Sequence, residues 1–181
     1  MHNDIKEVLF SEDEISAIVK TIAEQINNDY KDKNLLLICV LKGSVCFMAD
    51  LMREITIPCK IDFMAAKSYG SSTETSGVVN ITYDIAYDIS DYDLLIVEDI
   101  FDSGRTLQKL TNVLKSRNAR SVECCSLLDK PERRSDEVTM KLKYTGAAIP
   151  DAFVVGYGLD YAENYRNLPY IGILKPEIYS K

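Results

Sequence analysis

The chain has 181 residues, of which 46% are hydrophobic and 27% are charged. This length fits one compact domain, and the apolar content excludes intrinsic disorder because it is sufficient to offset the entropy of chain ordering. Lysine and arginine number 21 against 28 aspartates and glutamates, so the formal charge is −7. An acidic balance argues against a nucleic-acid partner, which requires a basic surface, but it does not exclude a small polyanionic ligand.

The composition also weighs against several classes of site. The single histidine, His2, lies near the N-terminus, which argues against a histidine-based catalytic triad or histidine-ligated zinc. Five cysteines without a CxxC pair fit a reduced, cytoplasmic protein with buried thiols. Residues 1–10 lack the apolar core of a signal peptide, and no apolar run approaches the roughly 18–20 residues that span a bilayer. We therefore expect no membrane partner.

The first half of the chain predicts helix, strand and helix in turn. Ser11 and Glu14 have the spacing of a capping box, and apolar residues over 15–26 then keep a helical period. The continuous apolar run at 35–41 predicts a strand that is buried on both faces. A helical stripe resumes over 45–55 and ends before Pro58.

Strands and helices continue to alternate after Pro58. Alternating residues over 59–65 predict a strand, and the polar stretch 68–77 predicts a long mobile loop. Further strands are expected at 78–85, 94–97, 122–128, 153–155 and 170–174, and a helix over 107–114. This order predicts an α/β fold, with a mainly parallel twisted sheet flanked by helices, in a single domain of residues 1–181.

The most informative stretch is Leu94–Thr106, with the sequence LLIVEDIFDSGRT. The apolar strand delivers Glu98 and Asp99 to its carboxyl end, the edge at which open α/β sheets bind ligands. Residues 102–106 precede a helix, and their glycine, hydroxyl and backbone N–H groups suit a phosphate. The two carboxylates suit a sugar diol or a metal ion. Together these groups provide what a ribose 5-phosphate needs.

Two other interpretations fit parts of this stretch. One is a capped helix after a strand, with a solvated acidic turn between them. Two carboxylates directly after four apolar residues make that interpretation less favourable. The other is a Walker B segment, which requires a GxxxxGK[ST] string that this sequence lacks.

LLIVEDIFDSGRT resembles the phosphoribosyl-pyrophosphate motif of the type I phosphoribosyltransferases. Other landmarks of that family follow in order: LKGS at 41–44, KSYG at 67–70, LLDKP at 127–131, FVVGYGLDY at 153–161 and YRNLPYIG at 165–172. The complete set is similar to the bacterial hypoxanthine-guanine phosphoribosyltransferases, the purine branch of the family. The resemblance implies a small hood formed by the terminal segments and a lid at residues 68–77, which excludes water from the reacting centre.

The resemblance implies roles for the central motif. Glu98 and Asp99 hold the ribose hydroxyls, and Asp102 acts as general base at N7 of the purine. The 5-phosphate is gripped by Asp102, Ser103, Gly104, Arg105 and Thr106. The donor is a magnesium complex, because clustered phosphate charge must be neutralised, and Glu98, Asp99 and Asp160 are the candidate Mg²⁺ ligands.

The resemblance also implies a pyrophosphate site and a base site. The pyrophosphate site comprises Lys42, Gly43, Ser68, Tyr69 and Arg166. In the family the turn at Lys42–Gly43 supplies backbone donors, often through an unusual cis peptide. The base site comprises Lys130, Phe153, Val154 and Asp160. In the family the lysine donates to the 6-oxo group, the aromatic ring stacks on the base, and the backbone of the next residue binds the base edge.

The implied activity is purine salvage. The enzyme transfers the 5-phosphoribosyl group from phosphoribosyl pyrophosphate to N9 of hypoxanthine or guanine, which gives IMP or GMP and pyrophosphate. Two alternatives stay open: a relative with another base preference, such as xanthine, and a non-catalytic regulator that binds RNA. The resemblance also implies a homodimer or a homotetramer that associates through the apolar stripe after the Lys42–Gly43 turn. Part of this stripe is expected to pack on the sheet instead; its members are Phe47, Met48, Leu51 and Met52.

Overall fold

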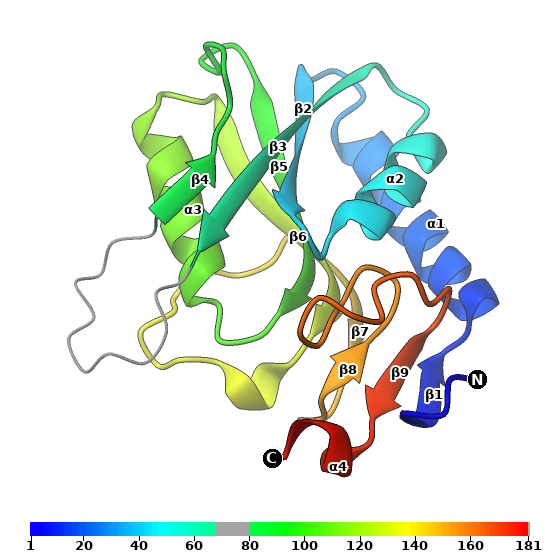
Figure 1. The fold of residues 1–181 in the computed structure, drawn as a ribbon. Coiled ribbons are helices and arrows are strands. Elements are labelled where there is room, and N and C mark those ends of the chain that lie inside the picture. Colours follow the sequence, from blue (N-terminus) through cyan, green and yellow to red (C-terminus); the bar gives the residue numbers. More distant parts are fainter. Residues whose placement is uncertain (68–79, 181) are drawn as a thin grey trace.

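The computed structural model describes residues 1–67 and 80–180 and contains two sheets (Figure 1). The strands of the larger sheet are β2 (Leu35–Leu41), β3 (Cys59–Lys67), β4 (Asn80–Tyr83), β5 (Asp93–Phe101), β6 (Ser121–Asp129) and β7 (Tyr144–Ala148). They lie in the order β4-β3-β2-β5-β6-β7, and every pairing except β3 with β4 is parallel. The predicted mainly parallel sheet is thus confirmed.

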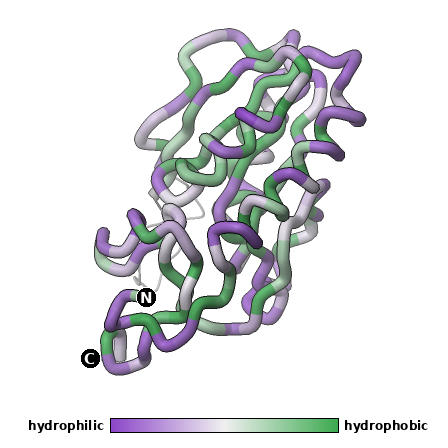
Figure 2. Tube along the Cα trace, turned by 90° about the vertical axis from the view of Figure 1, so that its right-hand side faces the viewer, coloured by the Kyte–Doolittle hydropathy of each residue, from purple (hydrophilic) through white to green (hydrophobic). Residues whose placement is uncertain are grey.

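Helices cover both faces of this sheet (Figure 1). Helices α1 (Glu12–Asp29) and α2 (Val45–Glu54) pack on one face, and α3 (Arg105–Ser116) packs on the other. Along β2, Leu35 and Leu37 join the core under α1 and α2, while Leu36 and Ile38 join the core under α3. This two-sided burial explains the unbroken apolar run of β2. Figure 2 shows hydrophobic residues mainly in the inner segments of the trace and hydrophilic ones mainly on its outer turns.

Helix α1 begins where the sequence predicts. The backbone N–H of Ser11 donates to the Glu14 carboxylate at 2.8 Å, and the Ser11 hydroxyl accepts from the Glu14 N–H at 3.4 Å. These reciprocal bonds satisfy two backbone donors of the first turn. The helix buries one stripe of apolar residues, namely Ile15, Val19, Ile22, Ala23 and Ile26.

Strands from both ends of the chain form the second sheet, which is the predicted hood. It consists of β1 (Ile5–Phe10), β9 (Ile171–Leu174) and β8 (Val154–Val155), in that order and antiparallel. The hood lies below the carboxyl ends of the large sheet, with the short helix α4 (Pro176–Tyr179) beneath it (Figure 1). Ligands at this edge of the large sheet therefore come within reach of the hood.

Several strands differ from the sequence expectations. Strand β7 was not predicted, because its sequence YTGAA forms no apolar run. Strand β1 was not predicted, because the charged residues Lys6 and Glu7 interrupt its alternation. Strand β5 continues four residues beyond Val97, because its pairing with β6 extends to Ile100 and Phe101. Glu98 and Asp99 consequently lie inside the strand rather than after it.

The apolar residues of α2 divide between the core and the surface, so the expectation that part of this stripe packs on the sheet is confirmed. Phe47, Met48 and Leu51 are buried in the core of the subunit, between α2, α1 and the sheet. Met52 is 37% exposed and is the one residue of the four that reaches the surface. Within residues 1–67 and 80–180, no helix combines the length and the apolar content that crossing a membrane requires.

Candidate active site

A cavity of about 260 Å³ lies at the carboxyl ends of β2 and β5. Its lining includes Glu98, Asp99, Asp102, Ser103, Gly104 and Thr106 from the central motif, and Leu41 and Gly43 from the turn after β2. The structure therefore brings the predicted phosphate loop, the acidic pair and the predicted pyrophosphate turn to one place.

The loop before α3 is shaped by Gly104. Its φ of 78° is a left-handed conformation, and a Cβ at this position would lie 2.7 Å from the Phe101 ring. Glycine therefore allows the chain to turn sharply and to present the backbone N–H groups of the first turn of α3 to an anion. The Arg105 side chain turns away from the cavity, donating to the Ser135 hydroxyl at 3.1 Å and lying 3.4 Å from Glu137. Arg105 therefore contributes its backbone N–H group, rather than its guanidinium, to an anion site.

Glu98 and Asp99 form a confined acidic pair. The Glu98 carboxylate accepts from the Asp99 N–H at 3.2 Å, and the Asp99 carboxylate accepts from the Ile100 N–H at 2.7 Å. Burial and the neighbouring Asp99 charge hold the pKa of Glu98 well above its usual range, and burial also raises the pKa of Asp99. Two confined carboxylates with raised pKa values are stabilised by a cation or by hydroxyl donors.

We expect Glu98→Gln to raise the melting temperature at pH 7 while it weakens activity. A carboxyl whose pKa is raised in the folded state binds its proton more tightly there, so its ionisation destabilises the fold as the pH rises through the folded pKa. Glutamine keeps the acceptor oxygen and removes the charge. The rise should be a few degrees, since about 1 kcal/mol corresponds to roughly 2–4 °C in a domain of this size. A melting temperature that stays constant or falls at pH 7 would contradict this account.

The turn after β2 packs directly against the acidic pair. The Leu41–Lys42 peptide bond is cis, as the family resemblance implies for this turn. A Cβ on Gly43 would lie 1.6 Å from Asp99 Oδ2, and a Cβ on Gly158 would lie 2.0 Å from the Gly43 carbonyl oxygen. Three chain segments therefore meet at Gly43 with no room for a side chain.

Asp102 faces two arginines that the sequence analysis did not select. Its Oδ1 is buried without a hydrogen-bond partner among the described residues and lies 3.6 Å from Arg133 Nε. Arg134 donates to the Asp102 backbone oxygen at 2.6 Å and to Asp129, and its guanidinium lies over the Phe101 ring. The signal that could have identified them is the pair of adjacent arginines close after Lys130, where Arg133 ends the short 3-10 turn Pro131–Arg133 and Arg134 follows it.

Lys130 is not a solvated surface charge. It is 8% exposed, and its ammonium donates to the Ala152 carbonyl at 2.8 Å. Phe153 follows directly, is 36% exposed, and stacks on Tyr179 with centroids 5.0 Å apart. Val154 is buried in β8 and pairs with Ile173. A buried cation beside a partly open aromatic ring is suited to a planar base that carries an acceptor.

Arg166 anchors the loop on the other side of Gly43. It pairs with Asp160 at 2.9 Å and with Glu163 at 3.4 Å, and it donates to the Gly158 carbonyl at 2.8 Å. Its Nε is buried and has no hydrogen-bond partner within the described part of the chain. Glu163 also pairs with the Lys42 ammonium at 2.9 Å. The two cations predicted for pyrophosphate thus share one carboxylate.

The acidic pair fits a magnesium ion that also binds substrate. Among the residues that the structure describes, no three histidine, cysteine or acidic side chains are grouped to hold a metal by themselves. Mg²⁺ is commonly held by one or two carboxylates together with substrate phosphates and water. Glu98 and Asp99 meet that requirement, and Asp160, the third candidate ligand, forms an ion pair with Arg166 at 2.9 Å. Ser68, Tyr69 and the predicted lid at 68–77 lie outside the described residues.

A family model for the phosphoribosyl transferase domain matches residues 9–162. The chain belongs to the phosphoribosyltransferase family. This phosphoribosyltransferase is 51% identical to the hypoxanthine-guanine phosphoribosyltransferase of Staphylococcus aureus strain Mu50 over 180 residues, which is 99% of each chain. It matches a crystal structure of a Staphylococcus aureus hypoxanthine phosphoribosyltransferase with a TM-score of 0.94 and 50% identity, covering 100% of this chain and 97% of that one. It also matches the Trypanosoma cruzi hypoxanthine phosphoribosyltransferase in complex with IMP, with a TM-score of 0.91, 39% identity and 99% of each chain covered.

Proposed function

We propose that this phosphoribosyltransferase transfers the 5-phosphoribosyl group from phosphoribosyl pyrophosphate to N9 of hypoxanthine or guanine, giving IMP or GMP and pyrophosphate. The observation that carries the proposal is the cavity at the carboxyl ends of β2 and β5, where an acidic pair, a glycine turn and a helix N-terminus meet. Full-length similarity to enzymes named for hypoxanthine and guanine supports the choice of base.

The phosphoribosyl group binds between the acidic pair and the start of α3. The Glu98 and Asp99 carboxylates accept hydrogen bonds from the ribose hydroxyls. The 5-phosphate binds the backbone N–H groups and hydroxyls of the 102–106 loop, where the helix N-terminus adds positive potential. Arg134 keeps this loop in place through its bond to the Asp102 backbone oxygen.

Glu98 and Asp99 would also hold Mg²⁺ together with the donor. When bound, the ion supplies positive charge that neutralises the pyrophosphate leaving group. The protein adds the Lys42–Gly43 turn and the partly exposed guanidinium of Arg166 to bind the same group. Asp160 orients Arg166 through their ion pair.

The base binds over Phe153 with its 6-oxo group toward Lys130. A fixed, buried ammonium favours a carbonyl acceptor and disfavours an amino group at the same position, which accounts for selection of 6-oxo purines over adenine. The Val154 backbone lies at the edge of the base. Asp102 accepts the proton from N7 as N9 bonds to the ribose carbon, so the purine gains the sugar while the pyrophosphate leaves.

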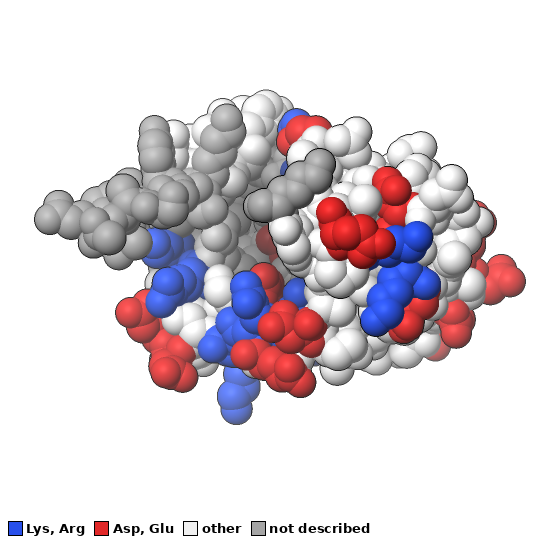
Figure 3. Space-filling model, turned by 60° about the horizontal axis from the view of Figure 1, so that its bottom comes forward, with Lys and Arg blue, Asp and Glu red and all other residues white. Residues whose placement is uncertain are grey.

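A spectrophotometric assay with phosphoribosyl pyrophosphate, Mg²⁺ and hypoxanthine, guanine, xanthine or adenine tests this proposal. Turnover of hypoxanthine and guanine supports it, and a dominant xanthine rate identifies the related enzyme with another base preference. Absence of turnover with all four bases refutes it. A regulator that binds RNA is the less favoured alternative, because acidic and basic side chains lie intermixed on the face seen in Figure 3.

Lys130→Ala should raise the KM for hypoxanthine and guanine roughly tenfold or more, because the variant loses a charged hydrogen-bond donor to the base. The KM for phosphoribosyl pyrophosphate should stay near its wild-type value. Lys143→Ala is the matched control, since that ammonium pairs with Asp29 on α1, away from Phe153. Equal KM values for the two purines in Lys130→Ala and wild type would remove Lys130 from base recognition.

We propose that the chain assembles as a homodimer or homotetramer. With Phe47, Met48 and Leu51 inside the subunit, the large apolar residues that α2 leaves exposed to a partner are Val45 and Met52. Light scattering at micromolar concentration should give two or four times the chain mass of 20.4 kDa. A mass near 20.4 kDa for a fully active sample would refute the assembly.

Residues 1–181 act as one domain in this proposal, because β1 and β9 from opposite ends of the chain pair in one hood. A cytoplasmic location is supported by the five cysteines, which all lie in the described ranges and are all free thiols.

A further inference from the structure

The loop beside Gly43 has an unusual backbone. Gly156, Tyr157 and Gly158 are successive residues with φ values of 99°, 51° and 98°. Glycine adopts this left-handed region readily, whereas a residue with a side chain occupies it only where its surroundings hold it there. Tyr157 therefore needs a specific contact that fixes its position.

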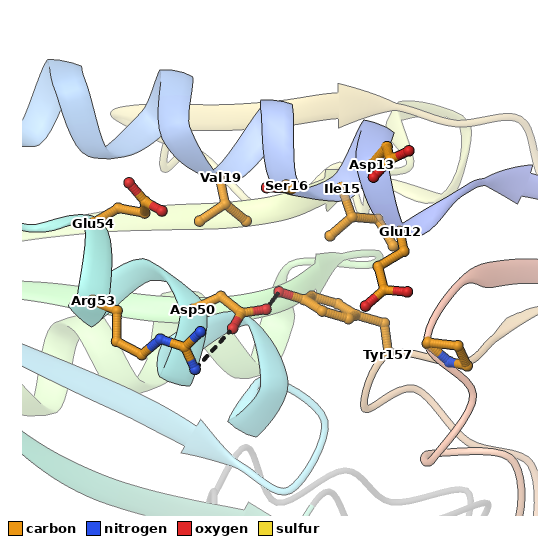
Figure 4. A pocket seen from close by; sticks show the side chains of 10 residues that line it. Glu12, Asp13, Ile15, Ser16, Val19, Asp50, Arg53, Glu54 and Tyr157 are labelled. Atoms are coloured by element: carbon orange, nitrogen blue, oxygen red, sulfur yellow. Dashed lines mark hydrogen bonds and ion pairs between the residues drawn. The ribbon is translucent and has the colours of Figure 1, made fainter.

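That contact is a hydrogen bond to α2. The Tyr157 hydroxyl donates to Asp50 Oδ2 at 2.6 Å, and the tyrosine is 9% exposed. Burial and the bond to Asp50 raise the pKa of Tyr157, so the phenol stays protonated as a donor. Figure 4 shows the ring extending from its loop to Asp50, with Arg53 3.7 Å from the same carboxylate.

The ring is held by this hydrogen bond and by packing in the core under α1 and α2, but one side of it is open. A cavity of about 360 Å³ adjoins it, lined by Glu12, Ile15 and Val19 of α1 and by Asp50 and Arg53 of α2 (Figure 4). Because this space is not filled by side chains, the ring has room to shift once its hydroxyl bond is removed.

The Tyr157–Asp50 hydrogen bond joins two segments that both border the proposed pyrophosphate site. The Gly158 N–H donates to the Arg166 carbonyl at 3.0 Å, and the Gly158 carbonyl accepts from the Arg166 guanidinium at 2.8 Å. Gly158 also lies against the Gly43 carbonyl. Asp50 belongs to the helix that begins directly after the Lys42–Gly43 turn.

We propose that Tyr157, through its hydrogen bond to Asp50, is a positioning residue that holds Arg166 and the Lys42–Gly43 turn in register for pyrophosphate. This inference rests on the proposed function, because it assigns a task within the same reaction. Tyr157 touches neither the base nor the ribose in this assignment. Its loss should therefore act on the pyrophosphate-bearing ligands alone.

Tyr157→Phe tests the inference, with the forward reaction and its reversal by pyrophosphate both measured. The KM for pyrophosphate and for phosphoribosyl pyrophosphate should rise roughly tenfold, the scale of a hydrogen bond to a charged group, while the KM for hypoxanthine stays unchanged. Tyr144→Phe is the matched control. Its hydroxyl donates to Asp29 at 2.7 Å, the same chemistry between β7 and α1, so it should lower the melting temperature without changing any KM.

Asp50 provides a second test that does not depend on the stability of Tyr157→Phe. Asp50→Ala removes the acceptor and should raise the same two KM values, and Asp50→Asn keeps an acceptor oxygen and should raise them less. Unchanged KM values in Asp50→Ala, or an equal rise in the KM for hypoxanthine, would overturn the inference. Wild-type protein without transferase activity would instead refute the proposed function.

Discussion

Asp102→Asn should lower kcat with hypoxanthine by about 10²–10⁴-fold, the usual loss when a general base is removed. Asparagine has the shape of aspartate but cannot accept a proton. The Asp102 side chain lines the cavity and is 44% exposed, which leaves its carboxylate accessible to N7 of the purine. Arg133, 3.6 Å away, holds the carboxylate in place and stabilises its charge.

Asp102→Asn should change neither the fold nor the binding of phosphoribosyl pyrophosphate. The Asp102 backbone oxygen, and not its side chain, carries the bond to Arg134 that positions the phosphate loop. Calorimetry should therefore give a wild-type affinity for phosphoribosyl pyrophosphate with Mg²⁺, and the melting temperature should stay close to that of wild type. Wild-type turnover by Asp102→Asn would show that another group accepts the proton.

The parts of the fold that could be predicted from sequence are those with strong local patterns. The apolar runs of β2 and β5 are long enough to indicate buried strands, and the Ser11–Glu14 box marks the start of α1. The same holds for the phosphate loop, because two carboxylates directly after four apolar residues distinguish it from an ordinary capped helix after a strand. In each case the neighbours in sequence determine the structure.

Features that depend on distant contacts could not be predicted in this way. Strand β1 exists because it pairs with β9, more than 160 residues later, and its own residues alternate poorly. The Tyr157–Asp50 bond joins residues 107 positions apart, and neither residue stands out from its neighbours. Burial of Phe47 and Leu51 likewise depends on where α1 packs. An apolar stripe in the sequence does not by itself show whether its residues lie in the core of the subunit or at an interface between subunits.

The active site is organised by close backbone packing as much as by charge. Gly43 touches Asp99 on one side, and its carbonyl touches Gly158 on the other. The acidic pair, the pyrophosphate turn and the Arg166 loop consequently have fixed relative positions. A substitution at Gly43 should therefore displace the acidic pair, the pyrophosphate turn and the Arg166 loop together.

Gly43→Ala should lower kcat/KM by about 10²-fold, because a displacement of about 1 Å in a catalytic site has effects of that size. The new Cβ would lie 1.6 Å from Asp99 Oδ2. Asp99 is held by the Ile100 N–H at 2.7 Å, and Gly158 blocks the turn from moving the other way. Steady-state kinetics with both substrates and a Mg²⁺ titration measure the effect.

Gly146→Ala is the control that separates local displacement from lost stability. Its Cβ would lie 2.3 Å from the Leu127 carbonyl oxygen, in the strand pairing of β6 and β7, away from the acidic pair. It should lower the melting temperature and leave the KM values and the Mg²⁺ dependence as in wild type. If Gly43→Ala behaves in the same way as Gly146→Ala, then contact between the turn and Asp99 does not organise the site. If close packing at Gly43 organises the site, Gly43→Ala should lose activity selectively. Its melting temperature should then be no lower than that of Gly146→Ala.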